Sequence, residues 1–230
     1  MTTGYLKRLA APKEWPIARK TAKFILRPRG ELRYGLPLGI VLRDVLGYAK
    51  TMREAKYILN TREVLVDGTR RKDEKIAVAL MSTLDFPDLE AAFRMVIGED
   101  KKLKLVKISK EESIVKVCRI NNKKTLNKGK MQLNLNDGTN VLSDNKDCKT
   151  GDSAVLALPK REVKSFFKLE KGAIAYLFGG EHAGTTGNVE GIDKDKLVIK
   201  SGKDTFETLK KFAIVIGNEK PAVTVTENGK

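Results

Sequence analysis

Residues 36–72 read LPLGIVLRDVLGYAKTMREAKYILNTREVLVDGTRRK, and this stretch decides how the front of the chain folds. Its first part predicts a short amphipathic helix, because apolar residues recur at helical spacing and form one stripe of Leu38, Val41, Leu42, Val45 and Leu46. Pro37 suits the first helical position, where a missing N–H costs nothing. Gly47 is the expected end of this helix.

The second part of the stretch predicts another helix followed by a tight hairpin. Thr51 and Glu54 form the T-x-x-E of a capping box, in which each side chain accepts a hydrogen bond from a backbone N–H near the helix start. The inward face is expected to hold Met52, Ala55, Ile58 and Leu59. The Asp67-Gly68 pair lies between two extended segments and predicts a two-residue turn, since both turn positions favour positive φ.

The cations of this stretch are expected to gather on one solvent-facing side. Arg53 and Lys56 lie on the outer face of the second predicted helix, and Arg70, Arg71 and Lys72 follow the turn. Such a surface suits phosphate groups. The T-x-x-E helix start followed by VLVDG (64–68) resembles the α-L RNA-binding domain, which occurs in a ribosomal small-subunit protein and in several RNA-modifying enzymes. That resemblance implies binding to structured RNA.

The net charge of the chain also indicates a polyanionic partner. The 230 residues have a formal net charge of +16, of which residues 1–72 carry +11 and residues 73–230 carry +5. A cationic front end binds phosphates through release of their counterions. We expect no membrane partner, since no apolar run approaches ~20 residues.

Residues 1–36 are predicted to form a basic arm without a core of its own. We expect this arm to be poorly ordered alone and to gain shape by threading along RNA. Trp15 is interpreted as a packing residue that pins the arm to the neighbouring domain. For Tyr5 and Tyr34, base stacking and the same pinning role both remain open.

The middle of the chain is predicted to be rich in strands. A hairpin is expected from Phe93–Ile97 and Leu103–Ile108, joined by a turn at Gly98–Lys101. Alternating or buried-type patterns predict further strands at residues 114–120, 131–135, 140–142 and 154–158. The cationic segment 121–130, NNKKTLNKGK, is predicted to be a loop, either solvated or in contact with RNA.

A glycine-rich segment, GGEHAGTTG (179–187), follows a predicted strand at residues 173–178. Its glycines permit positive φ, which we expect at Gly187, and a close approach of backbone N–H groups to an anion. A phosphate loop of a nucleotide-binding enzyme would need Gly-Lys-Ser/Thr entering a helix, whereas this segment runs into another predicted strand. The order of lysine-glycine, strand, glycine-rich loop and strand resembles the KOW motif, which implies a small SH3-like barrel.

The order of these parts resembles one family over essentially the whole chain, namely the archaeal and eukaryotic ("e" type) form of small-ribosomal-subunit protein four. The matching stretches are LKRLAAPKEW (6–15), residues 36–59, VLVDGTRRK (64–72), FGGEHAGTTGNVEGI (178–192) and FAIVIGNEKPAVT (212–224). The resemblance implies a structural constituent of the small ribosomal subunit, in the cytoplasm. Its partners would be small-subunit ribosomal RNA and neighbouring ribosomal proteins, with no small-molecule substrate.

We therefore predict an α+β, multidomain fold. Its expected parts are a basic arm (1–36), an α-L RNA-binding domain with the following hairpin (37–105), a β-rich central domain (106–168), an SH3-like KOW barrel (169–217) and a C-terminal tail (218–230). The predicted RNA-binding residues are Lys7, Arg8, Lys13, Arg19, Lys20, Lys23, Arg27, Arg29, Arg53, Lys56, Arg70, Arg71, Lys72, Lys171, Gly179, Gly180, His182 and Thr185.

The alternative function is an RNA-modifying enzyme with an appended α-L domain. A methyltransferase would need its glycine-rich turn between a strand and a helix, but here that turn joins two predicted strands. We predict no catalytic residue, cofactor or metal. Cys118 and Cys148 lie too far in sequence from each other and from His182 for a zinc pattern, and are expected to be buried or half-buried thiols. His182 is interpreted as an RNA or packing contact.

Overall fold

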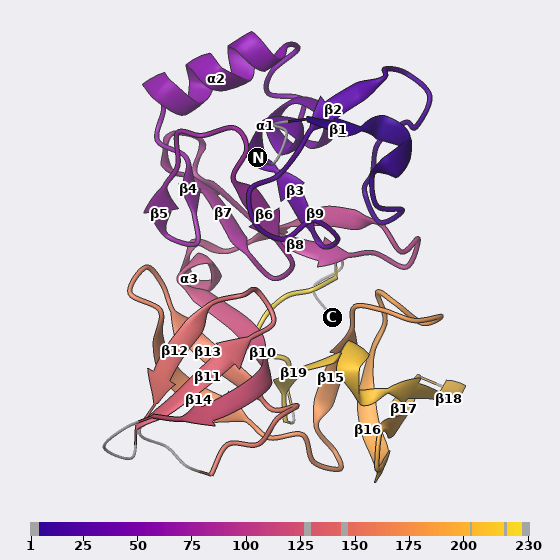
Figure 1. The fold of residues 1–230 in the computed structure, drawn as a ribbon. Coiled ribbons are helices and arrows are strands. Elements are labelled where there is room, and N and C mark those ends of the chain that lie inside the picture. The colour runs from indigo at the N-terminus through magenta and orange to yellow at the C-terminus, as the bar shows by residue number, and fades with distance from the viewer. Residues whose placement is uncertain (1–4, 127–129, 144–146, 203, 219, 227–230) are drawn as a thin grey trace. The chain divides into compact units, whose positions relative to one another are not determined.

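The computed structural model describes residues 5–126, 130–143, 147–202, 204–218 and 220–226. The chain is mostly β-strand with few helices and divides into two compact units (Figure 1). Unit 1 contains the described residues up to Ile97 together with Lys102–Ser113. Unit 2 contains Gly98–Lys101 and the described residues from Ile114 onward.

Unit 1 is built on a five-stranded antiparallel sheet in the order β5-β4-β7-β8-β9. Its strands are β4 (Leu65–Val66), β5 (Thr69–Arg70), β7 (Thr83–Phe86), β8 (Ala91–Ile97) and β9 (Leu103–Ile108). Two smaller antiparallel pairs are β1 (Tyr5–Lys7) with β2 (Phe24–Leu26), and β3 (Gly35–Pro37) with β6 (Ala77–Ala79). The helices are α1 (Leu38–Ile40), α2 (Met52–Thr61) and α3 (Lys110–Ser113), with single 3₁₀ turns at Arg8–Ala10 and Pro87–Leu89.

The predicted first helix is present in altered form. Pro37 is not its first residue but ends β3 in an extended conformation, because it pairs with Ala77 of β6. The helix then widens into a π-helical turn at Val41–Val45, where the Leu46 N–H donates to the Val41 carbonyl at 2.9 Å. Gly47 ends the turn with φ 68°, as expected.

The N-terminal arm is folded, so the expectation of a loose arm is wrong for its described residues; residues 1–4 lie outside them. The indole of Trp15 is 2% exposed and its Nε1–H donates to the Leu32 carbonyl at 3.1 Å. The Glu14 carbonyl accepts the Leu103 N–H at 2.7 Å. Burial of apolar side chains outweighs repulsion between the arm's cations. Trp15 is a buried packing residue, as interpreted, and the Glu14 backbone beside it attaches the arm to β9.

The two predicted hairpins of unit 1 are confirmed. Asp67 and Gly68 have φ of 51° and 68°, which places both turn positions in the left-handed region, and β4 pairs with β5 across them. Strand β8 pairs with β9 from Ala92↔Ile108 to Ile97↔Leu103.

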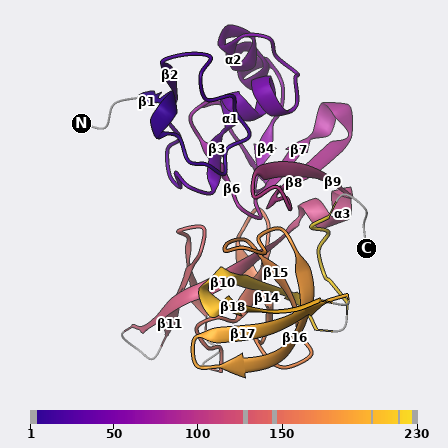
Figure 2. The same ribbon diagram turned by 90° about the vertical axis from the view of Figure 1, so that its right-hand side faces the viewer.

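Unit 2 consists of two five-stranded antiparallel sheets. The first has the order β12-β11-β10-β13-β14, formed by β10 (Val115–Thr125), β11 (Met131–Leu135), β12 (Asn140–Ser143), β13 (Ser153–Ala157) and β14 (Glu162–Phe167). The second has the order β18-β17-β16-β15-β19, formed by β15 (Ile174–Leu177), β16 (Thr186–Asp193), β17 (Lys196–Ser201), β18 (Asp204–Leu209) and β19 (Ala213–Gly217). Figure 2 shows the strong curvature of β16 and β17 in this second sheet.

The predicted loop at 121–130 is wrong for residues 121–125, which continue β10. Lys123 pairs with Leu133 and Thr125 with Met131 of β11. Polar side chains are compatible with this strand because they are exposed while the backbone groups pair. Residues 127–129 of the predicted loop lie outside the described residues, as do residues 219 and 227–230 of the predicted tail.

Each sheet of unit 2 has its own apolar core, and a buried hydrogen bond joins the two sheets. One core includes both predicted thiols, Cys118 and Cys148, which are buried as expected. The Ser153 hydroxyl of β13 accepts the Val215 N–H of β19 at 2.9 Å. This hydrogen bond satisfies the buried Val215 N–H, which would destabilise the fold if it had no acceptor.

A buried ion pair holds the turn between β11 and β12. Lys116 Nζ lies 2.8 Å from Asp137 Oδ2, and the two side chains are only 3% and 4% exposed. The Thr139 hydroxyl and N–H also donate to Asp137 Oδ1 at 2.6 and 2.9 Å. Burial alone would raise the pKa of Asp137, but the charge of Lys116 and these hydrogen bonds outweigh it and lower the pKa to about 2.

We expect Asp137→Asn to destabilise the protein by about 3 kcal/mol at neutral pH, because the Lys116 ammonium stays buried without its charge partner. The stabilisation from Asp137 is present above its unfolded pKa of ~3.9 and is lost as pH falls toward 2, so the variant should lack that part of the acid dependence. Urea unfolding between pH 7 and pH ~2 measures both effects. The exposed Asp193→Asn is the control, and equal curves for the two variants would contradict the assignment.

Gly187 does not have the positive φ that we expected. The reason for glycine is a close approach between strands, since a Cβ there would lie 2.5 Å from the Lys200 carbonyl oxygen of β17. Gly191, on the same strand, has ordinary room, with the nearest atoms 3.5 Å away on Val198. The strand β16 thus has one crowded and one uncrowded glycine.

We expect Gly187→Ala to destabilise unit 2 by about 1–3 kcal/mol through overpacking against a backbone that cannot yield. Gly191→Ala is the matched control and should change the free energy of unfolding far less. Thermal and urea unfolding of both variants test this, and a Gly187→Ala curve that overlays the wild type would show that the crowding is absent.

Candidate nucleic-acid interface

The cations of helix α2 are displayed by a helix whose start is fixed. The Thr51 hydroxyl accepts the Glu54 N–H at 3.2 Å, and Glu54 Oε2 accepts the Lys50 N–H at 2.8 Å, which confirms the capping box. The hydrogen bond from Lys50 lowers the pKa of Glu54. Ala55 and Leu59 are buried on the inner face, so Arg53 and Lys56 are exposed on the outer one.

The β4–β5 hairpin is anchored from beneath by a buried carboxylate. Asp67 is 8% exposed, and its two oxygens accept the Thr83 N–H at 3.1 Å and the Ser82 hydroxyl at 3.2 Å. These bonds fasten the turn to β7. The neighbouring residues Arg70 and Lys72 remain exposed, and Arg71 is half-buried.

The structure brings the helix and the hairpin together, as the sequence predicted. Arg70 Nη2 donates to the carbonyl of Asn60, in the last turn of α2, at 3.4 Å. Lys56 Nζ lies 3.2 Å from Glu74 Oε1, two residues beyond Lys72. The ion pair with Glu74 offsets part of the Lys56 charge, so Arg53, Arg70 and Lys72 are the more open cations of this cluster.

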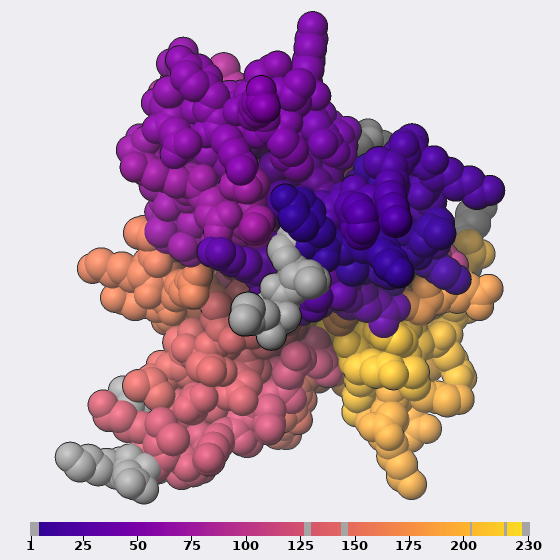
Figure 3. Space-filling view, turned by 45° about the horizontal axis from the view of Figure 1, so that its top comes forward, coloured from indigo at the N-terminus to yellow at the C-terminus, as the bar shows by residue number. Residues whose placement is uncertain are grey.

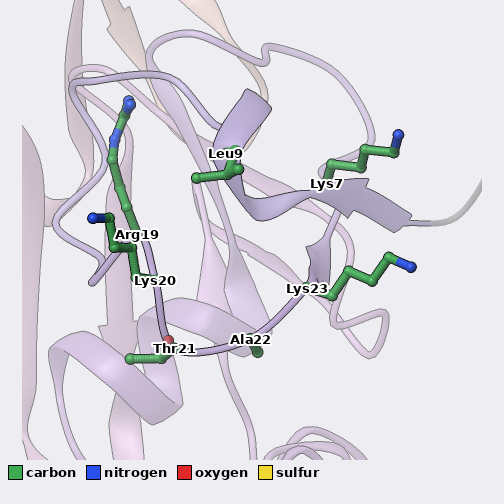
Figure 4. Close-up of a pocket in the computed structure, with 7 residues that line it drawn as sticks. All are labelled: Lys7, Leu9, Arg19, Lys20, Thr21, Ala22 and Lys23. Carbon is green, nitrogen blue, oxygen red and sulfur yellow. The ribbon is translucent and has the colours of Figure 1, made fainter.

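The arm presents a second group of cations. Lys7, Lys13, Arg19, Lys20, Lys23 and Arg29 are exposed and Arg27 is half-buried. Arg29 Nη1 is 2.7 Å from Asp73 Oδ2, which offsets its charge. Lys7, Arg19, Lys20 and Lys23 line a pocket of about 620 Å³ together with Leu9 (Figure 4). Figure 3 shows the arm and the α2 region on one face of unit 1.

Arg8 differs from the other cations of the arm. It is 8% exposed, and its Nη1 donates to the Ala18 carbonyl at 2.6 Å. Its N–H also donates to the Lys23 carbonyl at 3.0 Å. The buried guanidinium closes the loop between β1 and β2, so Arg8 supports the arm from within and does not belong with the solvent-facing set.

The glycine-rich loop in unit 2 is shaped by internal contacts. Gly180 has φ 87° and is exposed, whereas Gly179 is buried where a Cβ would lie 2.5 Å from the Phe212 ring. The His182 ring stacks on Phe206 at 3.9 Å with an interplanar angle of 19°, and the Thr185 hydroxyl donates to the His182 carbonyl at 2.7 Å. His182 is therefore a packing residue, one of its two interpretations. Lys171 is exposed beside Gly172, ahead of β15.

Phe24 is a surface residue that sequence reasoning missed. Phe24 is 53% exposed on β2, with Lys23 Nζ 5.5 Å from the ring centroid. The sequence holds only a short apolar run, FIL (24–26), and no periodic pattern marks its pairing with YLK (5–7).

The structure offers neither a metal cluster nor a spanning helix within the part of the chain that it describes. Its His, Cys, Asp and Glu side chains form no group of three or more that could hold a metal ion. None of its helices is long and apolar enough to cross a membrane.

Comparisons with known proteins assign the family. The model of ribosomal family S4e matches residues 89–163, and that of the RS4NT (NUC023) domain matches residues 5–30. The small ribosomal subunit protein eS4 of Methanocella arvoryzae is 40% identical, covering 97% of this chain and 98% of its own length. The chain belongs to the ribosomal S4e family. The eS4 protein of Methanococcus aeolicus is 36% identical over 96% of this chain and 97% of its own length.

The S4e assignment agrees with the fold. The crystal structure of the 30S ribosomal protein S4e from Thermoplasma acidophilum matches with a TM-score of 0.71 and 26% identity, covering 80% of this chain and 96% of that one. This family is one of ribosomal structural proteins, so the S4e chain is not an enzyme and the RNA-modifying alternative is dropped. The RS4NT match coincides with the β1–β2 ribbon and its cationic pocket.

Two neighbouring cations of the S4e arm should respond differently to removal of their charge. We expect Arg8→Gln to lower the stability of the protein by about 1–3 kcal/mol, because the hydrogen bond to the Ala18 carbonyl and the packing of the buried guanidinium are lost. Lys7→Gln, one residue away and exposed, should leave the stability within about 0.5 kcal/mol. Urea unfolding of the two variants compares them directly, and equal losses would contradict the internal role of Arg8.

Proposed function

We propose that this S4e chain is a structural constituent of the small ribosomal subunit that binds small-subunit ribosomal RNA and neighbouring ribosomal proteins in the cytoplasm. The observation that carries the proposal is the 40% identity over 97% of the chain to a small ribosomal subunit protein. The net charge of +16 supports it, because a polyanionic partner offsets the repulsion among these cations.

The parts of the fold fit named modules of such a protein. We assign α2 with the β4–β5 hairpin and the β8–β9 hairpin to an α-L RNA-binding domain (37–105), preceded by the arm (1–36). Strands β10–β14 correspond to the central domain (106–168), and β15–β19 to an SH3-like KOW barrel (169–217) that precedes the tail (218–230). The fixed capping box and the anchored turn support the α-L assignment.

The proposed RNA contacts are mostly sequence-independent. Arg53, Lys56, Arg70, Arg71 and Lys72 form what we call the helix–hairpin clamp, and a clamp of this kind reads phosphate spacing and A-form shape. Lys7, Lys13, Arg19, Lys20, Lys23, Arg27 and Arg29 extend the contact along the arm. The exposed Gly180 and Lys171 provide a separate contact from unit 2, shaped by Gly179, His182 and Thr185.

Removal of two clamp cations should reduce the number of counterions released on binding. We expect Arg70→Gln with Arg71→Gln to weaken binding to small-subunit ribosomal RNA and to lower the log–log salt slope by about one to two units. Filter binding over a range of salt concentrations measures the slope, and an unchanged slope would remove the clamp from the proposal.

The matched control for the clamp removes two cations from the second sheet of unit 2. Lys196 and Lys200 are 3.1 and 3.2 Å from Glu207 and Glu190, so their positive charge is already offset. Lys196→Gln with Lys200→Gln should leave the slope at its wild-type value. The proposed function itself is tested by co-sedimentation of the wild-type chain with small ribosomal particles at moderate ionic strength. A chain that does not co-sediment would overturn the proposed function.

A further inference from the structure

The β1–β2 ribbon has one buried and one open face. In its antiparallel register Leu6 lies opposite Ile25, and Ile25 is 4% exposed, so this pair faces the interior. Tyr5 lies opposite Leu26 and Lys7 opposite Phe24, which places these four residues on the other face, because residues directly opposite share a side of the ribbon.

Two aromatic side chains are exposed to solvent on that outer face. Tyr5 is 65% and Phe24 is 53% exposed, although rings of this size usually bury most of their surface. They are diagonal neighbours across the two strands, a separation of ~7–8 Å between Cα positions that lets both rings contact one ligand. The paired backbone fixes their spacing.

Cations flank the Phe24 ring. Lys7 lies opposite Phe24 in the register, and Lys23 Nζ lies 5.5 Å from the Phe24 centroid. Figure 4 shows Lys7 and Lys23 extending the same way from the two strands, while Arg19 and Lys20 lie on the other side of the pocket. The ligand must therefore offer flat apolar faces and closely spaced negative charge.

We propose that the outer face of the β1–β2 ribbon is a stacking platform for unpaired bases of RNA, with Tyr5 and Phe24 as the rings and Lys7 and Lys23 as phosphate contacts. This inference rests on the proposed function and names a class of RNA that the helix–hairpin clamp does not require. Aromatic side chains on a sheet surface stack bases, and such stacks tolerate any sequence.

The charge of this region favours RNA over a protein partner. Residues 5–30 contain eight Lys and Arg and one acidic residue, Glu14. Glu14 Oε1 is itself 2.8 Å from Arg33 Nε. A duplex also fits the platform poorly, because its bases are stacked on one another and present only their edges.

The test uses the full chain with two probes, a short unstructured oligoribonucleotide and the duplex of the same sequence. Tyr5→Leu with Phe24→Leu keeps the apolar volume and the charge but removes both rings. We expect affinity for the single strand to fall about 10-fold or more and the salt slope to stay the same, with little change for the duplex. Tyr5→Phe with Phe24→Tyr should retain wild-type affinity.

Tyr57→Leu is the matched control, because Tyr57 is 69% exposed on α2 and lies outside the ribbon. This substitution should not lower the affinity for the single strand more than the affinity for the duplex. Unchanged single-strand affinity in the double leucine variant, or equal losses for both probes, would overturn the platform. So would a variant that binds both RNAs normally but fails to join small ribosomal subunits, since the face would then contact a protein. If the wild-type chain bound neither probe nor the particles, the proposed function itself would fail.

Discussion

The cationic surface of unit 1 depends on the burial of Trp15. Its indole is enclosed and donates to the Leu32 carbonyl, and the adjacent Glu14 carbonyl accepts the Leu103 N–H of β9. These contacts hold a segment dense in like charges against the fold despite their mutual repulsion. A surface that is already ordered loses less conformational entropy when RNA binds, so more of the contact energy remains as affinity.

Buried polar groups hold the loops and turns where apolar packing alone would leave them free to shift. Asp67 fastens the β4–β5 turn, Asp137 the turn after β11, and Ser153 joins the two sheets of unit 2. In unit 1, burial lowers the pKa of Arg94 to about 10 despite the opposing effect of Glu112, so this guanidinium stays charged at neutral pH. Its Nη2 donates to the Glu112 carbonyl at 3.0 Å and ties α3 to β8.

Local patterns in the sequence were sufficient to predict the features that depend only on interactions between neighbouring residues. The capping box of Thr51 and Glu54 and the Asp67-Gly68 turn each depend on a few adjacent residues, and both form as predicted. Long-range pairing was not readable in this way. Residues 121–125 look like a loop until β11 supplies the backbone partners, and Gly187 is needed because β17 lies close to it.

The predicted interface residues also divide into those that local patterns indicate and those that depend on long-range pairing. Residue type and spacing indicated the exposed cations of α2 and of the hairpin, since a charged residue opposite an apolar stripe faces solvent. The burial of Arg8 and the exposure of Phe24 follow instead from the pairing of β1 with β2. No periodic pattern in the sequence predicts this pairing. The folded arm is thus the feature that sequence reasoning could not supply.

Hydrogen exchange in the free chain tests this central point most directly. The Trp15 indole N–H and the Leu103 amide report the contacts that hold the arm, and both should exchange at least about 100-fold more slowly than unprotected groups before any RNA is added. Exchange at the unprotected rate in the free chain, with protection only after RNA is added, would contradict the account. The arm would then be unfolded in the free chain and would fold on binding RNA.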